Sequence, residues 1–445
     1  METKAAGMLY NPAAWQVIAV AVIFLVTYAF VITDKINRAV AALAGAFLIL
    51  VLGILDLRYA FTEAVGWRVI MLLIGMMLLV GILNRAGVIP YIAIKLAQWV
   101  KGSSWKIFIL LIALTGISSA FLDNVTIMLL VIPVTMSITK LLKLNPYPFI
   151  FAEIAASNIG GAATLIGDPV NMIIGSANKQ LTFNAFIIHL GPVSLFILIV
   201  TIGLFLFVYR KHFKPTHKSK EASELMKLSA SSYIKNRPLM IKSVVVFLLT
   251  IIAFTLHSAL GIEPAAIALG SAALLMVIGL KRKEAEIAFR MVDWGTILFF
   301  IGLFIMVAGL SATNWTNQIA LVVLQMTSGN VDIASLLLLW ISGVASATMD
   351  NVPFVTAMVP VIQAMGAELG LSAGQMEPLW WSLSLGANLG SNGTLIGASA
   401  NVIAAGLALR EGKSFHFRAF LKVGAPIALM SLLVSTAYVY FILIP

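Results

Sequence analysis

The 445-residue chain contains no cysteine and few charged residues. Without cysteine it cannot form disulfides, thiolate metal sites or cysteine nucleophiles. Charged residues make up 11% of the sequence, against roughly 25% in soluble domains, while hydrophobic residues make up 61%. This balance predicts a polytopic membrane protein rather than a soluble one.

Lysine and arginine are absent between Arg290 and Arg410, whereas residues 210–242 are rich in both. Such one-sided loops follow the positive-inside rule, so we expect residues 210–242 and 281–290 in the cytoplasm and no nucleic-acid partner. No Walker-type phosphate loop occurs, and we expect no enzymatic activity. We interpret residues 14–33 as a retained span in the inner (plasma) membrane and not as a signal peptide.

Apolar windows of a length that crosses about 30 Å of hydrocarbon as helix define the expected spans. They fall near residues 14–33, 37–55, 67–84, 190–209, 243–260, 265–281, 294–312 and 421–443. Windows 148–182 and 379–409 are interrupted by Gly, Asn and Pro, which predicts broken helices. Windows 105–140 and 334–364 are too long for one crossing and carry a central Asp, which predicts re-entrant hairpins. The expected fold is all-α, with about ten transmembrane helices and two such hairpins.

The chain nearly repeats itself. At an offset of 227, Trp67, Gly75, Asp123-Asn124-Val125 and Pro133 recur as Trp294, Gly302, Asp350-Asn351-Val352 and Pro360. At an offset of 230, "SNIGGAATLIGDPVN" (157–171) recurs as "ANLGSNGTLIGASAN" (387–401). An odd number of crossings separates the copies, which predicts inverted repeats with a binding site where the broken helices meet at the membrane midplane.

The repeats divide the chain into five expected parts. They are N-terminal scaffold helices (1–66), a first repeat (67–209), a cytoplasmic linker (210–242), further scaffold helices (243–293) and a second repeat (294–445). We expect residues 86–101 and 313–328 to form interfacial helices. The linker is expected to be a solvated connection, with a surface-lying helix near "SELMKL".

Polar residues of the hairpin tips and broken helices are expected to meet near the midplane. The predicted substrate- and ion-binding residues are Ser119, Asp123, Asn124, Thr126, Asn158, Thr164, Asp168, Asn171, Asp350, Asn351, Asn388, Asn392, Thr394 and Asn401. Their glycine neighbours let the backbone unwind and approach a ligand. Unwound carbonyl groups suit a cation such as Na⁺, and helix N-termini suit an anion.

Four acids, Asp123, Glu153, Asp168 and Asp350, fall in membrane segments, and the sequence places no Lys or Arg at comparable depth. Each charge costs about 2.5 kcal/mol or more there, so H⁺ or Na⁺ is expected to offset them. Asp168 and Glu153 align with apolar residues in the other repeat, which makes them the proton-coupling candidates. The expected Na⁺ ligands are Asp123, Asn124, Asn158, Asp350, Asn351 and Asn388. No cofactor other than this coupling ion is expected.

The motifs "FLDNVTIMLLVIPVT", "ASNIGGAATLIGDPVNMIIG", "SATMDNVPFVTAMVPV" and "GANLGSNGTLIGASANVIAAG" resemble signatures of the ion transporter superfamily. The branch they resemble most holds arsenite-pump-type permeases and the pink-eyed-dilution P protein. The resemblance implies a scaffold, a mobile transport part and an elevator-like mechanism. The expected partners are the lipid bilayer and a small inorganic substrate. A second copy of the chain, in a homodimer, and a cytoplasmic ATPase are further candidate partners.

The resemblance implies secondary transport of an anion or metalloid, or Na⁺/H⁺ exchange. Dicarboxylate carriers of the wider superfamily place Ser-Asn-Thr at their hairpin tips, where this chain has Asp123-Asn124 and Asp350-Asn351. Extra carboxylates disfavour a di- or tricarboxylate, whereas neutral arsenite can be held by hydroxyl, amide and carboxylate groups. Efflux of arsenite, with antimonite as an additional solute, coupled to H⁺ or Na⁺ is therefore our first hypothesis. Na⁺/H⁺ antiport and an inorganic anion permease are the alternatives.

Overall fold

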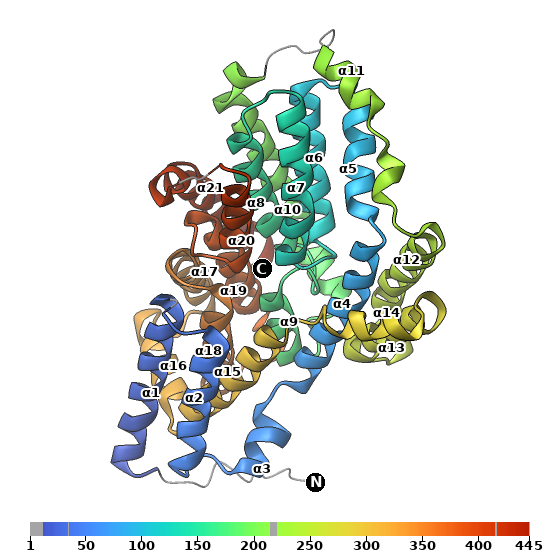
Figure 1. Ribbon diagram of the computed structural model, residues 1–445. Coiled ribbons are helices and arrows are strands. Elements are labelled where there is room, and N and C mark those ends of the chain that lie inside the picture. The colour runs from blue at the N-terminus through green and yellow to red at the C-terminus, as the bar shows by residue number, and fades with distance from the viewer. Residues whose placement is uncertain (1–11, 34, 214–219, 414–415, 445) are drawn as a thin grey trace.

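The computed structural model describes residues 12–33, 35–213, 220–413 and 416–444, and every regular element within these ranges is helical (Figure 1). Nine of the described helices are long and apolar enough to cross a membrane, and three shorter apolar helices accompany them. The all-α polytopic architecture expected from composition is confirmed.

The described residues of the first half form ten α-helices. They are α1 (Ala14–Thr33), α2 (Arg38–Val51), α3 (Leu57–Tyr59), α4 (Trp67–Arg85), α5 (Val88–Trp99), α6 (Ser104–Ser119), α7 (Asn124–Leu141), α8 (Tyr147–Ala162), α9 (Pro169–Ala177) and α10 (Phe183–Val208). The second half builds α12 (Arg237–Leu260), α13 (Pro264–Gly279), α14 (Arg282–Phe289), α15 (Trp294–Ala312), α16 (Trp315–Met326), α17 (Val331–Thr348), α18 (Asn351–Leu369), α19 (Glu377–Gly390), α20 (Ser399–Arg410) and α21 (Phe417–Tyr438).

Both long apolar windows form helical hairpins with the aspartate at the tip. α6 and α7 are joined by residues 120–123, and α17 and α18 are joined by residues 349–350. Asp123 and Asp350 accept hydrogen bonds from the first backbone N–H groups of α7 and α18, so each carboxylate caps the helix that follows it. Insertion of these hairpins as re-entrant elements stays a prediction, as do the five domain boundaries.

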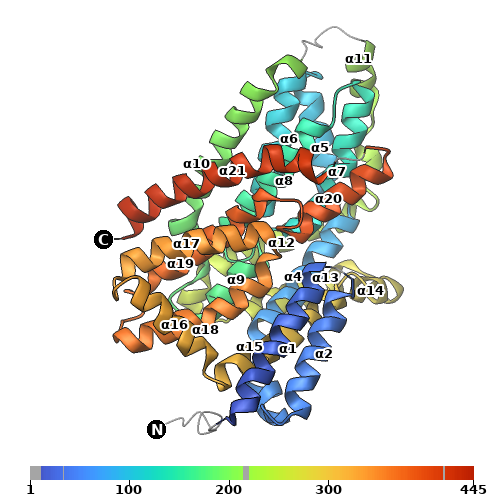
Figure 2. The same ribbon diagram turned by 90° about the vertical axis from the view of Figure 1, so that its left-hand side faces the viewer.

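Equivalent helices of the two halves make equivalent contacts. α2 packs on α15 as α13 packs on α4, α6 packs on α8 as α17 packs on α19, and α20 lies against α7 as α9 lies against α18. In the last two pairs, the second segment of each broken helix, α9 or α20, lies against the hairpin of the other half, while the first segment stays with its own hairpin. In Figures 1 and 2, α1, α2 and α15 form one group of helices, and α4, α12, α13 and α14 form another.

Close backbone contacts at glycine recur in both halves. A Cβ atom added to Gly160 would lie 2.0 Å from the carbonyl oxygen of Gly116, and one added to Gly390 would lie 2.2 Å from that of Gly343. Gly116 and Gly343 are 227 residues apart, and Gly160 and Gly390 are 230 apart, as in the sequence alignment. Only glycine allows each broken helix to approach its hairpin this closely.

The linker is more structured than expected. It contains α11 (Lys220–Lys227) where "SELMKL" predicts a helix, but residues 225–233 dock on α5 instead of lying in solvent. Leu225 is fully buried, and the side chain of Gln98 donates hydrogen bonds to the carbonyl oxygens of Leu225 and Leu228. α12 also begins at Arg237, inside the predicted linker, because Asn236 caps it and Pro238 suits its first turn.

The outer faces of the long helices are apolar. On α10, Ile188, Leu195, Phe196, Ile199 and Phe207 are each more than half exposed. A soluble monomer rarely exposes so much contiguous apolar surface, and lipid tails would cover it. These faces therefore place the long helices in a bilayer and leave the polar interior to the site.

We predict that Gly160→Ala destabilises the protein by about 1–3 kcal/mol or more, because its methyl group would overlap the Gly116 carbonyl group. Thermal melting of the purified protein measures this loss. Gly203→Ala on α10 is the matched control, since nothing lies within 4 Å of its added Cβ and alanine favours the helix. Equal melting temperatures for the two variants would contradict the close-contact argument.

Candidate functional site

The unwound backbone of each broken helix is held by one asparagine. Between α8 and α9, Asn171 Nδ2 donates to the carbonyl oxygens of Gly161, Ala162 and Thr164 at 3.1, 3.3 and 2.8 Å. In the second half, the counterpart of Asn171 is Asn401, whose Nδ2 donates to the carbonyl oxygens of Ser391 and Thr394 at 2.9 and 3.0 Å. Carbonyl groups freed from a helix need such partners away from water.

Hydroxyl groups join each hairpin to its broken helix. Ser119 donates to the carbonyl oxygen of Ser157 at 2.7 Å, and Thr164 donates to that of Ala120. The second half repeats both bonds at equivalent positions: Ser346 to Ala387 at 2.5 Å and Thr394 to Ala347 at 2.5 Å. Ser119, Thr164 and Thr394 thus act here as backbone partners, and none of the three lines the central cavity.

Two asparagines tie the halves together reciprocally. Asn158 Nδ2 donates to Asn401 Oδ1 at 3.0 Å, and its counterpart Asn388 donates to Asn171 Oδ1, also at 3.0 Å. Asn158 also donates to Asn392 Oδ1 at 2.9 Å. All these amides are at most 1% exposed. Asn171 and Asn401, which bind the unwound segments, therefore each accept a hydrogen bond from an asparagine of the other half.

A cavity of about 910 Å³ opens beside this amide network. Its polar and charged lining residues are Arg38, Asn84, Arg85, Asp123, Asn124, Thr126, Asp168, Arg290, Asp293, Thr296, Asp350, Asn351 and Ser399. Six of the fourteen predicted binding residues thus line the cavity, from both hairpin tips and from the start of α9. The other eight, Ser119, Asn158, Thr164, Asn171, Asn388, Asn392, Thr394 and Asn401, lie outside its lining.

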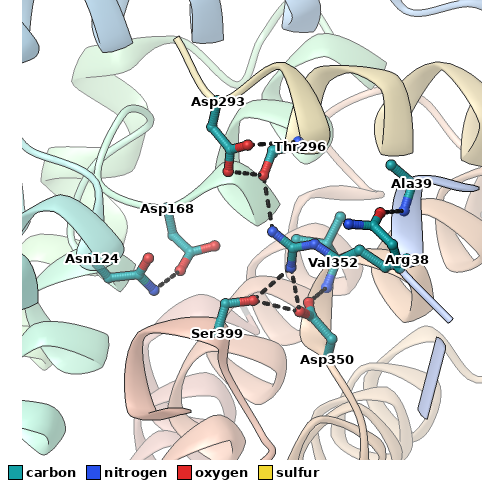
Figure 3. Close-up of polar contacts among 10 residues, drawn as sticks. Arg38, Ala39, Asn124, Asp168, Asp293, Thr296, Asp350, Val352 and Ser399 are labelled. Atoms are coloured by element: carbon teal, nitrogen blue, oxygen red, sulfur yellow. Dashed lines mark hydrogen bonds and ion pairs between the residues drawn. The ribbon is translucent and has the colours of Figure 1, made fainter. Parts of the chain in front are cut away.

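Asp168 projects from the N-terminus of α9 toward the first hairpin tip (Figure 3). Its Oδ2 accepts a hydrogen bond from Asn124 Nδ2 at 2.7 Å, and its Oδ1 accepts one from the backbone N–H of Val170 at 2.9 Å. The side chain is 2% exposed, and no ion pair to it occurs among the described residues. Asp168 is a buried carboxylate on the wall of a cavity, without a cationic neighbour in contact.

Asp123 is satisfied mainly by its own helix. It accepts bonds from the N–H groups of Val125 and Thr126, at 2.9 and 3.1 Å, and from the Thr126 hydroxyl group. The described part of the chain offers it no ion pair either. The Thr126 hydroxyl group is therefore already used in a hydrogen bond within the hairpin tip.

The expectation that no Lys or Arg reaches the depth of the acids is wrong. Arg38 Nη1 lies 3.4 Å from Asp350 Oδ2 and donates to Ser399 Oγ at 2.7 Å, while Nη2 donates to Thr296 Oγ1 at 2.9 Å (Figure 3). The error has a physical cause: α2 begins at Arg38 and has only 14 residues, so its first residue reaches the second hairpin tip. Asp350 consequently has an internal cation.

Arg38, Asp293 and Thr296 are site residues that the sequence interpretation missed. Asp293 accepts hydrogen bonds from the Thr296 N–H group at 3.1 Å and from its hydroxyl group at 2.6 Å, so it caps α15. An Asp followed three residues later by Thr at the start of an apolar window is a helix-start signal. Nothing in the local sequence indicates that this start lies beside Ser399 or Asp350.

Glu153, the second proton candidate, lies away from the cavity. It is fully buried in α8, and its Oε1 accepts a hydrogen bond from Thr135 on α7 at 2.5 Å. Its Oε2 has no hydrogen-bond partner among the described residues. A buried ionised carboxylate with one hydroxyl partner is costly, so the neutral acid suits this place.

The predicted Na⁺ ligands do not all face one space. Asp123, Asn124, Asp350 and Asn351 line the cavity, whereas Asn158 and Asn388 belong to the amide network behind it. Asn388 Nδ2 donates to the Ser384 carbonyl oxygen at 2.8 Å, which fixes the amide orientation and leaves Oδ1 buried without a partner. The described residues contain no cluster of three or more His, Asp or Glu side chains suited to a metal ion.

A second cavity, of about 480 Å³, lies at the other end of α9. Arg68, Lys179, His257 and Glu263 line it, and Arg68 Nη2 lies 3.5 Å from Glu263 Oε1. Met172, which is 2% exposed, lines both cavities. The two cavities therefore approach each other from opposite ends of a short helix, with a methionine between them.

The family model described as citrate transporter (CitMHS) matches residues 28–386. The chain belongs to this family of membrane transporters, within the superfamily that its motifs resemble. Relatives include an "Uncharacterized transporter" of Mycobacterium tuberculosis, 39% identical over 429 residues, which are 95% of this chain and 98% of the relative. The P protein of Sus scrofa is 31% identical over 500 residues, covering 95% of this chain and 59% of that protein.

The fold is shared with a solved structure. The YdaH transporter of Alcanivorax borkumensis matches with a TM-score of 0.62 over 96% of this chain and 97% of its own, at 15% identity. Such low identity supports a common fold and says nothing about the solute. The family match establishes the chain as a membrane transporter, and the solute of this chain is a separate question.

We predict that Asn171→Leu and Asn401→Leu each destabilise the protein by about 1–3 kcal/mol, because buried carbonyl groups lose their partners. Thermal melting of the purified variants measures this. Asn178→Ala, at the exit of α9, is the control, since its side chain bonds only the nearby Gln180 N–H group. Wild-type stability in both leucine variants would show that the unwound segments do not depend on these amides.

Proposed function

We propose that this transporter couples H⁺ to solute movement and that Asp168 carries the proton. The supporting observation is a carboxylate 2% exposed on the cavity wall, with an amide partner but no ion pair among the described residues. Leaving such a group charged in a membrane is costly, so binding a proton stabilises the site. Proton uptake also removes the negative charge that faces the solute.

The solute we propose is arsenite, moved outward, with antimonite as a chemical analogue. Asp350 is offset by Arg38, so the argument against carboxylate solutes rests on Asp123 and, before it takes up a proton, on Asp168. Neither acid has an ion pair among the described residues. A di- or tricarboxylate would meet like charges there. Neutral arsenite instead presents three hydroxyl groups, which the carboxylates, Asn124 and Ser399 can bind through hydrogen bonds.

Na⁺/H⁺ antiport is the second candidate, and one observation favours it. Asn388 Oδ1 is buried and has no hydrogen-bond partner among the described residues, and it lies next to the carbonyl-rich unwound segments. Amide and carbonyl oxygens are hard ligands of the kind that bind alkali and alkaline-earth cations. A Na⁺ ion entering this network would satisfy the orphaned oxygen.

The two cavities support alternating access in an elevator-like manner, in the inner membrane. Arg85 and Arg290 line the larger cavity, and the positive-inside distribution assigns them to the cytoplasm. The smaller cavity lies at the far end of α9, beyond Met172. Solute would enter from the cytoplasm and leave after the hairpins and broken helices move past the scaffold groups.

Fluxes in proteoliposomes test the solute. With an imposed pH gradient, we expect arsenite movement that collapses when the gradient is dissipated, and no movement of citrate. Parallel vesicles measure Na⁺ movement and chloride movement under the same gradient. Na⁺/H⁺ exchange without arsenite flux would overturn the arsenite proposal and support the second candidate.

We predict that Asp168→Asn reduces H⁺-driven flux to the level of empty vesicles, since an amide cannot take up the proton. Glu153→Gln is the matched control, because Glu153 is equally buried but lies outside the cavity, and its H⁺-driven flux should persist. Undiminished H⁺-dependent flux in Asp168→Asn would remove Asp168 as the carrier. Loss in Glu153→Gln alone would move that role to Glu153.

A further inference from the structure

Arg38 joins elements of different parts of the fold. Its guanidinium group contacts Thr296 at the start of α15, Asp350 at the tip between α17 and α18, and Ser399 at the start of α20. Ser399 in turn donates to Asp350 Oδ2 at 2.9 Å, and Thr296 donates to Asp293 Oδ2 at 2.6 Å. Arg38 therefore contacts Asp350 directly and is linked to Asp293 through Thr296 (Figure 3).

The residue equivalent to Arg38 in the other half is not a cation. Gly302 on α15 faces the backbone of Ala42 on α2, just as Gly75 on α4 faces the backbone of Ala268 on α13. Ala42 lies four residues after Arg38, and four residues before Ala268 the chain has Pro264. A proline side chain can neither donate hydrogen bonds nor carry charge.

Asp293 is also without a counterpart. It lies one residue before Trp294, and the residue before the matching Trp67 is Gly66. The surroundings of the second hairpin tip thus hold an added acid, Asp293, together with the added Arg38, which reaches this tip from α2. The first half keeps Asp123 and Asp168 with hydrogen-bond donors only among the described residues.

We propose that Arg38 is a tethered counter-cation, which occupies at the second hairpin tip the place that a coupling cation would take. The negative charge of Asp350 at the second tip is then neutralised without H⁺ or Na⁺. The transported proton is taken up only in the first half. This inference rests on the proposed function for its role in transport. Its structural part, the dependence of Asp350 on Arg38, does not involve the solute.

Other charged or titratable groups face this pair. Asp293 lies on α15, Asp168 at the start of α9 and Tyr28 on α1, and both Asp168 and Tyr28 are within electrostatic range of Asp350. Arg38 also lies over the Phe299 ring, at 5.5 Å from its centroid. All of the acids add negative potential, so loss of Arg38 leaves Asp350 more exposed to repulsion.

Thermal melting of the purified protein in detergent at pH 8, without solute, tests the structural part. The variants are Arg38→Gln, Arg38→Lys, Asp350→Asn and the double variant Arg38→Gln/Asp350→Asn. Arg38→Gln should lower the melting temperature by about 2–4 °C or more, Arg38→Lys by less, and Asp350→Asn in the double variant should restore most of the loss. Arg85→Gln is the control, because Arg85 lines the same cavity but pairs with Glu284 at 3.7 Å, so Asp350→Asn should not rescue it.

Two melting results would overturn the proposal. In the first, Arg38→Gln melts at the same temperature as the wild type. In the second, the double variant loses as much melting temperature as the two single variants together. If Arg38→Gln cannot be purified, the double variant must be recoverable, and failure of both also overturns it. In proteoliposomes, the number of H⁺ moved per solute should rise in Arg38→Gln and stay unchanged in Arg282→Gln, since Arg282 is an exposed residue of α14 that lines neither cavity. An unchanged ratio in Arg38→Gln refutes the coupling role. Absence of any H⁺-driven flux in the wild type, with the melting results as expected, overturns the proposed function alone.

Discussion

The structure depends on one constraint: backbone that leaves the helix inside a membrane must find hydrogen-bond partners from its own protein. The segments after α8 and α19 leave the helix, and Asn171 and Asn401 supply the donors for their carbonyl groups. Ser119 and Ser346 fasten each hairpin to the broken helix beside it. The central cavity can exist beside irregular backbone because these bonds keep that backbone in one conformation.

Charge is distributed unequally over this symmetric frame. The hydroxyl and amide partners recur in both halves, whereas Arg38 and Asp293 lie near the second hairpin tip only and Asp168 lies near the first. Shared residues therefore build the frame, and unshared residues set the electrostatics of the cavity. In a transporter, unequal halves allow one side of the site to hold a fixed charge while the other exchanges a proton.

Much of the fold could be predicted from the sequence because membrane length and backbone satisfaction leave few solutions. Excess window length with a central Asp located both hairpins, and Gly-Asn-Pro interruptions located both broken helices. Arg38 could not be located in this way, since its position follows from the short length of α2 and the packing of α2 on α15. The docked linker was missed for a similar reason: basic composition indicates the side of the membrane but not a contact such as Leu225 with α5.

The site was predicted as one group of residues, and the structure separates it into two. Polar residue types that recur at equal spacing in both halves cannot distinguish an amide that lines the cavity, such as Asn124, from one that holds backbone, such as Asn171. That distinction depends on side-chain direction and on partners hundreds of residues away in the chain.

The reciprocal bonds of Asn158 to Asn401 and of Asn388 to Asn171 carry a consequence for both halves of the chain. Each half supplies an amide that the other half needs, so neither broken helix is self-sufficient. A change of either amide pair therefore affects the unwound segments of both halves. The same mutual dependence makes the two broken helices a single mechanical body, so motion of one against the other would break the bonds that keep both unwound.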